Sequence, residues 1–170
     1  MELMSEWSYQ RGSPRQDNIS IELATFEGCP RGPELSVEEL AADGFDSSPP
    51  WFFLLVAEEE EGGLVGYALC NRAYSSWTRR ALYLEDLYVR PSLRGRGVGG
   101  RLVRALCRVA AELGAARIDW HVLESNRTAR AFYRGLGARD LRESEGRAAL
   151  RLDREHILRL AADTPTVLDA

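Results

Sequence analysis

A cluster of glycines between a predicted strand and a predicted helix is the feature that most constrains the fold of this chain. Four glycines fall within positions 95–100, and Arg94 and Arg96 flank the first of them. Apolar residues then recur at the spacing of one helical face, at Leu102, Leu106, Val109 and Leu113. Glycines here expose backbone N–H groups, and the start of a helix adds partial positive charge, so the segment predicts a phosphate or pyrophosphate site.

Two kinds of phosphate-binding loop are compatible with this pattern. Gly95, Gly97 and Gly100 match the G-x-G-x-x-G of dinucleotide folds, and Asp119 follows about 20 residues later. Against that reading, residues 91–94 separate the strand from the first glycine, where a dinucleotide fold needs a tight turn. A P-loop is excluded because the chain contains no lysine.

The second pattern is Arg/Gln-x-x-Gly-x-Gly/Ala, which Arg94, Gly97 and Gly99 satisfy. In this reading Arg94 and Arg96 add charge-assisted donors to the backbone N–H groups of the loop.

Charge is distributed unevenly along the 170 residues. Residues 1–70 carry 3 Arg and 14 acidic residues, a net charge of −11, whereas residues 71–170 carry 19 Arg and 12 acidic residues, a net charge of +7. The asymmetry predicts two partners of opposite charge. Nucleic acid is not an expected partner, because acidic residues interrupt the arginines of the second half.

Composition narrows the class of protein further. The longest apolar run, residues 51–57, is far shorter than the roughly 20 residues that cross a bilayer, so no membrane partner is expected. Glu2 and Glu6 make the first residues unlike a signal peptide. The three cysteines are widely spaced and form no metal-binding pattern with either histidine, which predicts reduced thiols, no metal and a cytoplasmic protein.

The expected secondary structure is a mixed order of helices and strands. Helices are predicted over 19–26, 37–44, 98–113, 126–137 and 154–162. Strands are predicted over 51–58, 64–72, 82–90, 116–123, 138–141 and 147–152. A bulge or face change is expected in the third strand, near Asp86. Residues 1–18 are expected to be a lead-in and 163–170 a tail, around a single domain over 19–162.

The Arg94–Gly99 pattern resembles the acetyl-CoA loop of the GNAT N-acetyltransferases. The segments YLEDLYVRPSLRGRGVG, ESNRTARAFYRGLGARDL and EGRAALRLDREHILRLA resemble the diamine (spermidine/spermine) and thialysine acetyltransferase branch. The chain departs from that branch at Ser125 and Arg147, where Trp is common, and in residues 1–18. The resemblance implies an α/β (α+β) GNAT fold, with a mixed, mostly antiparallel sheet, helices on both faces and a splayed cofactor cleft between two central parallel strands.

The resemblance also implies how the donor acetyl-CoA binds. A strand would pair with the pantetheine arm, the glycine-rich loop would hold the pyrophosphate, and the start of the next helix would line the arm. The implied cofactor-binding residues are Leu87, Tyr88, Val89, Arg94, Gly95, Arg96, Gly97, Val98, Gly99, Asn126, Arg127, Thr128 and Ala129.

Two side chains are candidates for proton transfer. A Lys-like amine has a pKa near 10.4, so the attacking amine must lose a proton, and Glu85 is the candidate base. In a regular strand Asp86 would point to the opposite face. Tyr133 is implied by the resemblance to protonate the departing thiolate, although its helical spacing fits a packed aromatic residue equally well.

The implied acceptor is a small cationic amine. The resemblance implies that seven residues bind it, namely Phe26, Glu27, Glu85, Asp119, Trp120, His121 and Glu145. The expected function is acetyl transfer to a primary amine of a polyamine or similar molecule, in a direct ternary complex. Acetylation of a protein N-terminus or an aminoglycoside, and a degenerate acyl-CoA-binding module, are the alternatives. The branch implies a homodimer.

Overall fold

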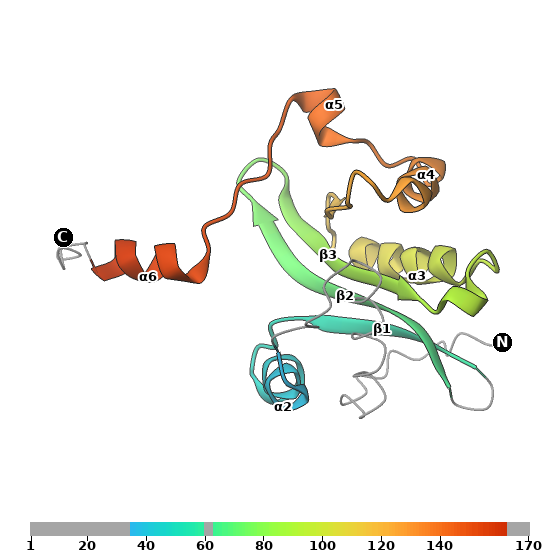
Figure 1. Ribbon diagram of the computed structural model, residues 1–170, viewed down its shortest axis with the longest axis horizontal. Coiled ribbons are helices and arrows are strands. Elements are labelled where there is room, and N and C mark those ends of the chain that lie inside the picture. Colours follow the sequence, from blue (N-terminus) through green and yellow to red (C-terminus); the bar gives the residue numbers. More distant parts are fainter. Residues whose placement is uncertain (1–34, 60–62, 163–170) are drawn as a thin grey trace. The chain divides into compact units, whose positions relative to one another are not determined.

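A computed structural model of the chain describes residues 35–59 and 63–162 (Figure 1). The chain divides into two compact units, residues 1–121 and 122–170, and each is described by itself. The predicted lead-in, the helix predicted over 19–26 and the C-terminal tail lie outside the described residues. The single domain predicted over 19–162 stays a prediction.

The first unit contains a four-stranded sheet with the strand order β1-β2-β3-β4. Its strands are β1 (Phe53–Glu58), β2 (Leu64–Ser75), β3 (Arg79–Val89) and β4 (Ile118–Asp119). Antiparallel pairing joins β1 to β2 and β2 to β3, while β3 and β4 are parallel. The mixed, mostly antiparallel sheet and the β1–β2 hairpin are therefore confirmed.

A β-bulge interrupts β3 at the position predicted from the sequence. Leu69 of β2 pairs with Asp86, and the next residue, Cys70, pairs with Leu84, so Glu85 is the extra residue. Leu84 packs on the core, and the next core-packed residue of β3 is Leu87. The bulge thus lets the strand resume its apolar face one residue late and keeps both carboxylates off that face.

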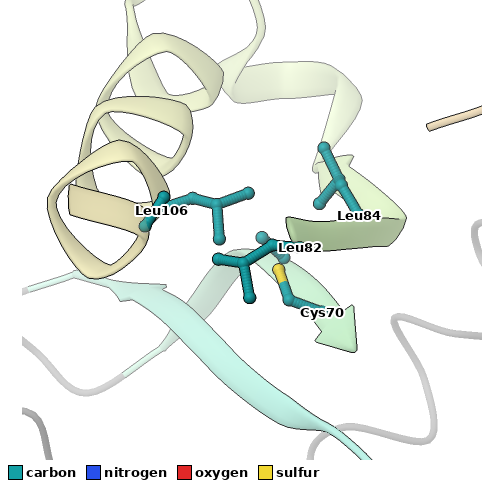
Figure 2. Packing of buried hydrophobic residues seen from close by; sticks show 6 residues of the cluster. Cys70, Leu82, Leu84 and Leu106 are labelled. Atoms are coloured by element: carbon teal, nitrogen blue, oxygen red, sulfur yellow. The ribbon is translucent and has the colours of Figure 1, made fainter. Parts of the chain in front are cut away.

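Helix α3 (Val98–Glu112) covers one face of this sheet and packs against β1, β2 and β3. Figure 2 shows Leu106 of α3 directed towards Cys70 of β2 and Leu82 and Leu84 of β3, which form one buried cluster. Burial in this cluster, reinforced by the charge of Asp86, raises the pKa of the Cys70 thiol to about 12. Each fully buried leucine contributes about 1.5–3 kcal/mol, so α3 and the sheet hold each other in place.

A short helix precedes the sheet. Helix α2 (Val37–Ala41) begins with the predicted capping box, in which Ser36 and Glu39 each accept a hydrogen bond from the other's backbone N–H. It continues into a π-helical turn, Ala42–Asp46. A Cβ at Gly44 would lie 2.3 Å from the Phe52 ring, so only glycine fits where this turn meets the start of β1.

The second unit is helical. It contains α4 (Arg127–Gly135), α5 (Leu141–Glu145) and α6 (Arg154–Ala162). Asn126 caps α4 as predicted, because its side-chain oxygen accepts a 3.0 Å hydrogen bond from the Ala129 N–H. The predicted helix over 154–162 is confirmed by α6. None of the helices in the two described ranges has the length and apolar character needed to cross a membrane.

Three strand predictions were wrong. The strand predicted over 116–123 is reduced to the two residues of β4, because the chain leaves β3 after Asp119. The strand predicted over 138–141 leads instead into α5, which begins at Leu141 after Asp140 accepts hydrogen bonds from the N–H groups of Arg142 and Glu143. Residues 147–152 form neither helix nor strand, and Leu150 is 95% exposed.

Candidate active site

The glycine-rich loop leads from β3 into the first turn of α3. A 3₁₀ turn, Pro91–Leu93, follows the strand, and Gly97 takes the position immediately before the helix. Gly95 and Gly97 have φ angles of +75° and +81°, a region that side chains with a Cβ rarely adopt. No heavy atom lies within 4 Å of a Cβ at either position, so backbone conformation rather than crowding calls for glycine there.

Two arginines of this loop have different surroundings. The Nε of Arg94 donates a 2.9 Å hydrogen bond to the Val89 carbonyl, and its guanidinium lies 5.7 Å from the centroid of the Tyr88 ring. Arg94 therefore fastens the loop to the end of β3. Arg96 is exposed between the two positive-φ glycines.

These features fit a pyrophosphate group. The first turn of α3 contains no acidic residue, and its leading N–H groups lie at the positive end of the helix dipole. Open glycines let a ligand approach the backbone closely, and Arg96 adds a guanidinium. The predicted cofactor residues Gly95–Gly99 thus form one continuous segment whose geometry suits an anion.

The edge of β3 opposite β2 pairs with β4 over only part of its length. Parallel pairing with β4 covers Leu82 and Tyr83, whereas β3 continues to Val89. The predicted residues Leu87, Tyr88 and Val89 lie along this continuation. Main-chain groups at such an edge suit an extended, amide-containing ligand, which would add to the sheet as a further strand.

The two carboxylates at the bulge have different surroundings. Glu85 is exposed, which makes its carboxylate accessible to a substrate. Asp86 is half-buried, and its Oδ2 lies 3.4 Å from the hydroxyl of Tyr67. The bulge removes the regular alternation that would have put these carboxylates on opposite faces.

Two polar residues around β4 lie on the face that points away from α3. Leu82 and Ile118 are paired and pack on the core, so the next pair, Tyr83 and Asp119, faces the other way. Asp119 forms a 2.7 Å ion pair with Arg117. Trp120 packs against the core, and His121 beyond it returns to the polar face.

Tyr83 was not predicted from the sequence to lie beside the candidate site. Its hydroxyl is hydrogen-bonded to Nδ1 of His121, and the two ring centroids are 5.8 Å apart. The signal was available in the alternation of β3, which puts Tyr83 two residues before Glu85. The contact of Tyr83 with His121 depends on the parallel register between β3 and β4.

The second unit contains the remaining described candidates. Asn126 and Ala129 form the cap of α4, and Arg127 and Thr128 are exposed in its first turn. Tyr133 lies on the same helix beside Phe132, with ring centroids 5.1 Å apart. Burial raises the pKa of Tyr133 to about 12, so its hydroxyl stays protonated at neutral pH and is available as a proton donor.

Glu145 is already paired with arginine within the second unit. Its carboxylate lies 2.8 Å from Arg147 and 3.3 Å from Arg139. Arg147 is one of the positions where the chain departs from the branch pattern. This pairing reduces the negative charge that Glu145 offers to a cationic amine.

The structure therefore distributes the predicted site over two sets. The first unit brings together the bulge, the cofactor segment of residues 87–99 and Asp119–His121. The second unit contains Asn126–Ala129, Tyr133 and Glu145. Phe26 and Glu27 lie outside the described residues.

Comparison with known proteins identifies the family. Residues 17–138 match the acetyltransferase (GNAT) family. The chain is 41% identical over 147 residues to the pig thialysine N-epsilon-acetyltransferase, covering 82% of this chain and 86% of that protein. It is 34% identical over 146 residues to human spermidine/spermine N(1)-acetyltransferase-like protein 1, covering 82% of this chain and 21% of that protein.

Solved structures agree with the fold. An integron cassette protein from the mobile metagenome of Vibrio cholerae superposes with a TM-score of 0.70 at 26% identity, covering 86% of this chain and 90% of that one. The chain is therefore an N-acetyltransferase of the GNAT family and belongs to its diamine/thialysine acetyltransferase branch.

Proposed function

We propose that this protein transfers an acetyl group from acetyl-CoA to a primary amine of a polyamine or a similar small cationic amine. Both substrates would be bound together, and the acetyl group would pass directly between them. The observation that carries the proposal is the glycine-rich segment at the start of α3, preceded by a strand whose bulge exposes a carboxylate.

The donor side of the proposal uses the loop and the edge of β3. The pyrophosphate of acetyl-CoA would lie against Arg96 and the N–H groups of Gly97–Gly99, and the main chain of Leu87–Val89 would bind the pantetheine arm. Acetyl-CoA supplies the activated thioester. Asn126–Ala129 would line the arm in the bound state.

The proton transfers are assigned to two side chains. Glu85 would accept a proton from the amine nitrogen, because its carboxylate is exposed at the bulge of β3. Tyr133, whose hydroxyl is protonated at neutral pH, would protonate the departing thiolate, as the family resemblance implies. No covalent acetyl-enzyme is needed, since the exposed Cys107 lies on α3 without a neighbouring base assigned to it.

The substrate class rests on the relatives. The pig relative is named for thialysine and the human one for spermidine and spermine, and both kinds of molecule carry a primary amine. The net negative charge of residues 1–70 would favour the approach of such a cation. Glu145 would contribute less than its position suggests, because Arg147 and Arg139 pair with it.

We further propose a cytoplasmic homodimer. Five apolar side chains near the end of the second unit are more than half exposed, which is unusual for a surface that stays in water. They are Leu150, Leu152, Ile157, Leu158 and Leu160. A second copy of the chain would cover them, and light scattering should then give twice the chain mass of 19.0 kDa.

The function is tested by thiol release from acetyl-CoA in the presence of single amines. The panel contains spermidine, spermine, putrescine, thialysine, an aminoglycoside and a peptide with a free N-terminus. The proposal expects release with at least one of the first four. Thiol release with the aminoglycoside or the peptide alone would contradict the proposed substrate class and indicate one of the alternatives. Binding of acetyl-CoA by calorimetry without any turnover would indicate a binding module instead.

A further inference from the structure

The chemistry of amide formation requires two proton removals from the amine nitrogen. A primary ammonium carries three N–H bonds, and the secondary amide product carries one. The departing thiolate takes up one proton, and a second proton leaves for solvent. A single carboxylate, Glu85, could remove both only by discharging the first proton within the reaction, so a second acceptor on the same face would separate the two steps.

His121 lies on that face of the sheet. It follows Asp119, the last residue of β4 that pairs with β3, and its exposed ring contacts the ring of Tyr83. Tyr83 precedes Glu85 by two residues on β3, a separation of about 7 Å along a strand. An amine bound over Glu85 would therefore also meet the imidazole of His121.

The Tyr83 hydroxyl orients the ring of His121. Because it occupies Nδ1, the other ring nitrogen, Nε2, is the atom that points to a ligand. A ring that carries its hydrogen on Nδ1 donates it to the Tyr83 oxygen and leaves a lone pair on Nε2. A base held by a third group in this way is the arrangement that proton-transfer sites use.

The charged and titratable neighbours of His121 come from both strands around it. Tyr83 and Glu85 belong to β3, and Arg117 and Asp119 precede His121 by four and two residues. The 2.7 Å ion pair between Arg117 and Asp119 balances their two charges. Within this set of described residues, Glu85 is thus the carboxylate whose charge no other member balances in an ion pair, and a cationic amine would be attracted to it.

We propose that His121 is a second catalytic proton acceptor, held by Tyr83, and that it removes the first proton from the substrate ammonium; this rests on the proposed function. One N–H bond of the ammonium breaks, and the proton binds Nε2 of His121. The electron pair left on nitrogen attacks the thioester carbonyl carbon. The carbon–sulfur bond breaks, Tyr133 protonates the thiolate, and Glu85 takes the second proton from nitrogen. Of the two protons removed from nitrogen, one restores the Tyr133 hydroxyl and the other leaves for solvent.

The test is the pH dependence of turnover in His121→Gln. At pH 7 its kcat is expected to fall by more than about tenfold, the low end of what a general base contributes. The defect should shrink about tenfold with each pH unit towards the amine pKa near 10.4, because the free amine then no longer needs a base. Acetyl-CoA affinity and the melting temperature should stay close to wild type, and imidazole should restore turnover to His121→Ala.

A matched control and a spectroscopic readout complete the experiment. The second histidine, His156 on α6, is not among the residues proposed for the site, so His156→Gln should keep the wild-type profile. Nitrogen-15 NMR of the His156→Gln protein should show the hydrogen of His121 on Nδ1, and Tyr83→Phe should shift that signal.

The outcomes separate the two proposals. If the wild-type protein acetylates none of the amines, the proposed function is overturned and this assignment with it. An active wild type with an unimpaired His121→Gln, or with a defect that is constant from pH 7 to 9.5, overturns this assignment alone. A hydrogen on Nε2 in the free protein also overturns it.

Discussion

Different interactions stabilise each of the two units of this chain internally. In the described residues, every buried hydrophobic side chain lies between Phe52 and Ala110, within the first unit. Helices α4, α5 and α6 of the second unit contain no buried residue. Their contacts include helix caps, such as those of Asn126 and Asp140, exposed ion pairs, such as that between Arg134 and Glu143, and the ring contact of Phe132 with the half-buried Tyr133.

This difference means that the two units hold their candidate site residues with different firmness. Burying a large apolar side chain contributes about 1.5–3 kcal/mol, whereas an exposed ion pair contributes about 0.2–1 kcal/mol. The first unit can therefore hold the loop, the bulge and the Tyr83–His121 pair in a fixed geometry. The second unit carries Tyr133 on a helix whose stability depends much more on local contacts.

The largest expected difference between the units concerns apolar truncation. Leu106 is 1% exposed in the first unit, and Leu123 is 52% exposed in the second. Leu106→Ala is expected to lower the free energy of unfolding by about 2–5 kcal/mol because it leaves a cavity. Leu123→Ala should change it by about 0.5 kcal/mol or less. Urea unfolding followed by circular dichroism measures both, and equal losses would contradict the contrast.

The next effect tests whether the second unit takes part in the chemistry. Tyr133→Phe should lower kcat by more than about tenfold and leave acetyl-CoA affinity unchanged, since a lost general acid affects the chemical step alone. Because burial raises the pKa of Tyr133 to about 12, the wild-type hydroxyl stays protonated as pH rises, and no loss of activity from its ionisation is expected below pH 10. An unchanged kcat would leave Tyr133 with a packing role.

Helix caps give a smaller and more local contrast. Asn126 caps α4 in the second unit, and Ser36 caps α2 in the first. Asn126→Ala and Ser36→Ala should each cost about 1 kcal/mol of local helix stability. Because α4 has no buried residue to compensate, amide hydrogen exchange should quicken throughout α4 after the first change. If α4 remains as protected as β2 and β3, then tertiary packing holds it after all.

The smallest expected effect concerns the ion pairs of Glu145. Replacing both Arg139 and Arg147 by Gln should cost about 0.2–1 kcal/mol, because these side chains are exposed. The loss should disappear in 1 M NaCl, which screens such pairs. The same variant frees the carboxylate, so KM for a cationic amine should fall. A salt-independent loss would mean that the arginines act through packing.

The sequence predicted best the elements whose signals are local. The capping box of Ser36 and Glu39, the apolar face of α3 and the cap at Asn126 each depend on residues within a few positions of one another. The bulge was also predictable, because Leu84 and Leu87 break the alternation of β3 around two adjacent carboxylates. These signals correctly predicted where the glycine-rich loop lies, between β3 and α3.

The wrong predictions depend on pairing between distant residues. The strands over 116–123, 138–141 and 147–152 have strand-like composition, but a strand forms only where a partner continues beside it. In the first case β3 and β4 separate after Asp119, and in the second Asp140 provides a cap that favours a helix. Tyr83 was missed for the same reason, because its contact with His121 joins positions that are 38 residues apart.

The bulge at Glu85 is separable from the packing of the sheet. Exchanging Glu85 for another residue leaves the residue count of β3 intact, so the sheet should keep its register. Deleting it would place Asp86 directly after Leu84 and keep the pairs Leu84–Cys70 and Asp86–Leu69, so Leu87 should stay under α3. The extra residue thus adds a second carboxylate at this end of β3 without disturbing the core on the other face.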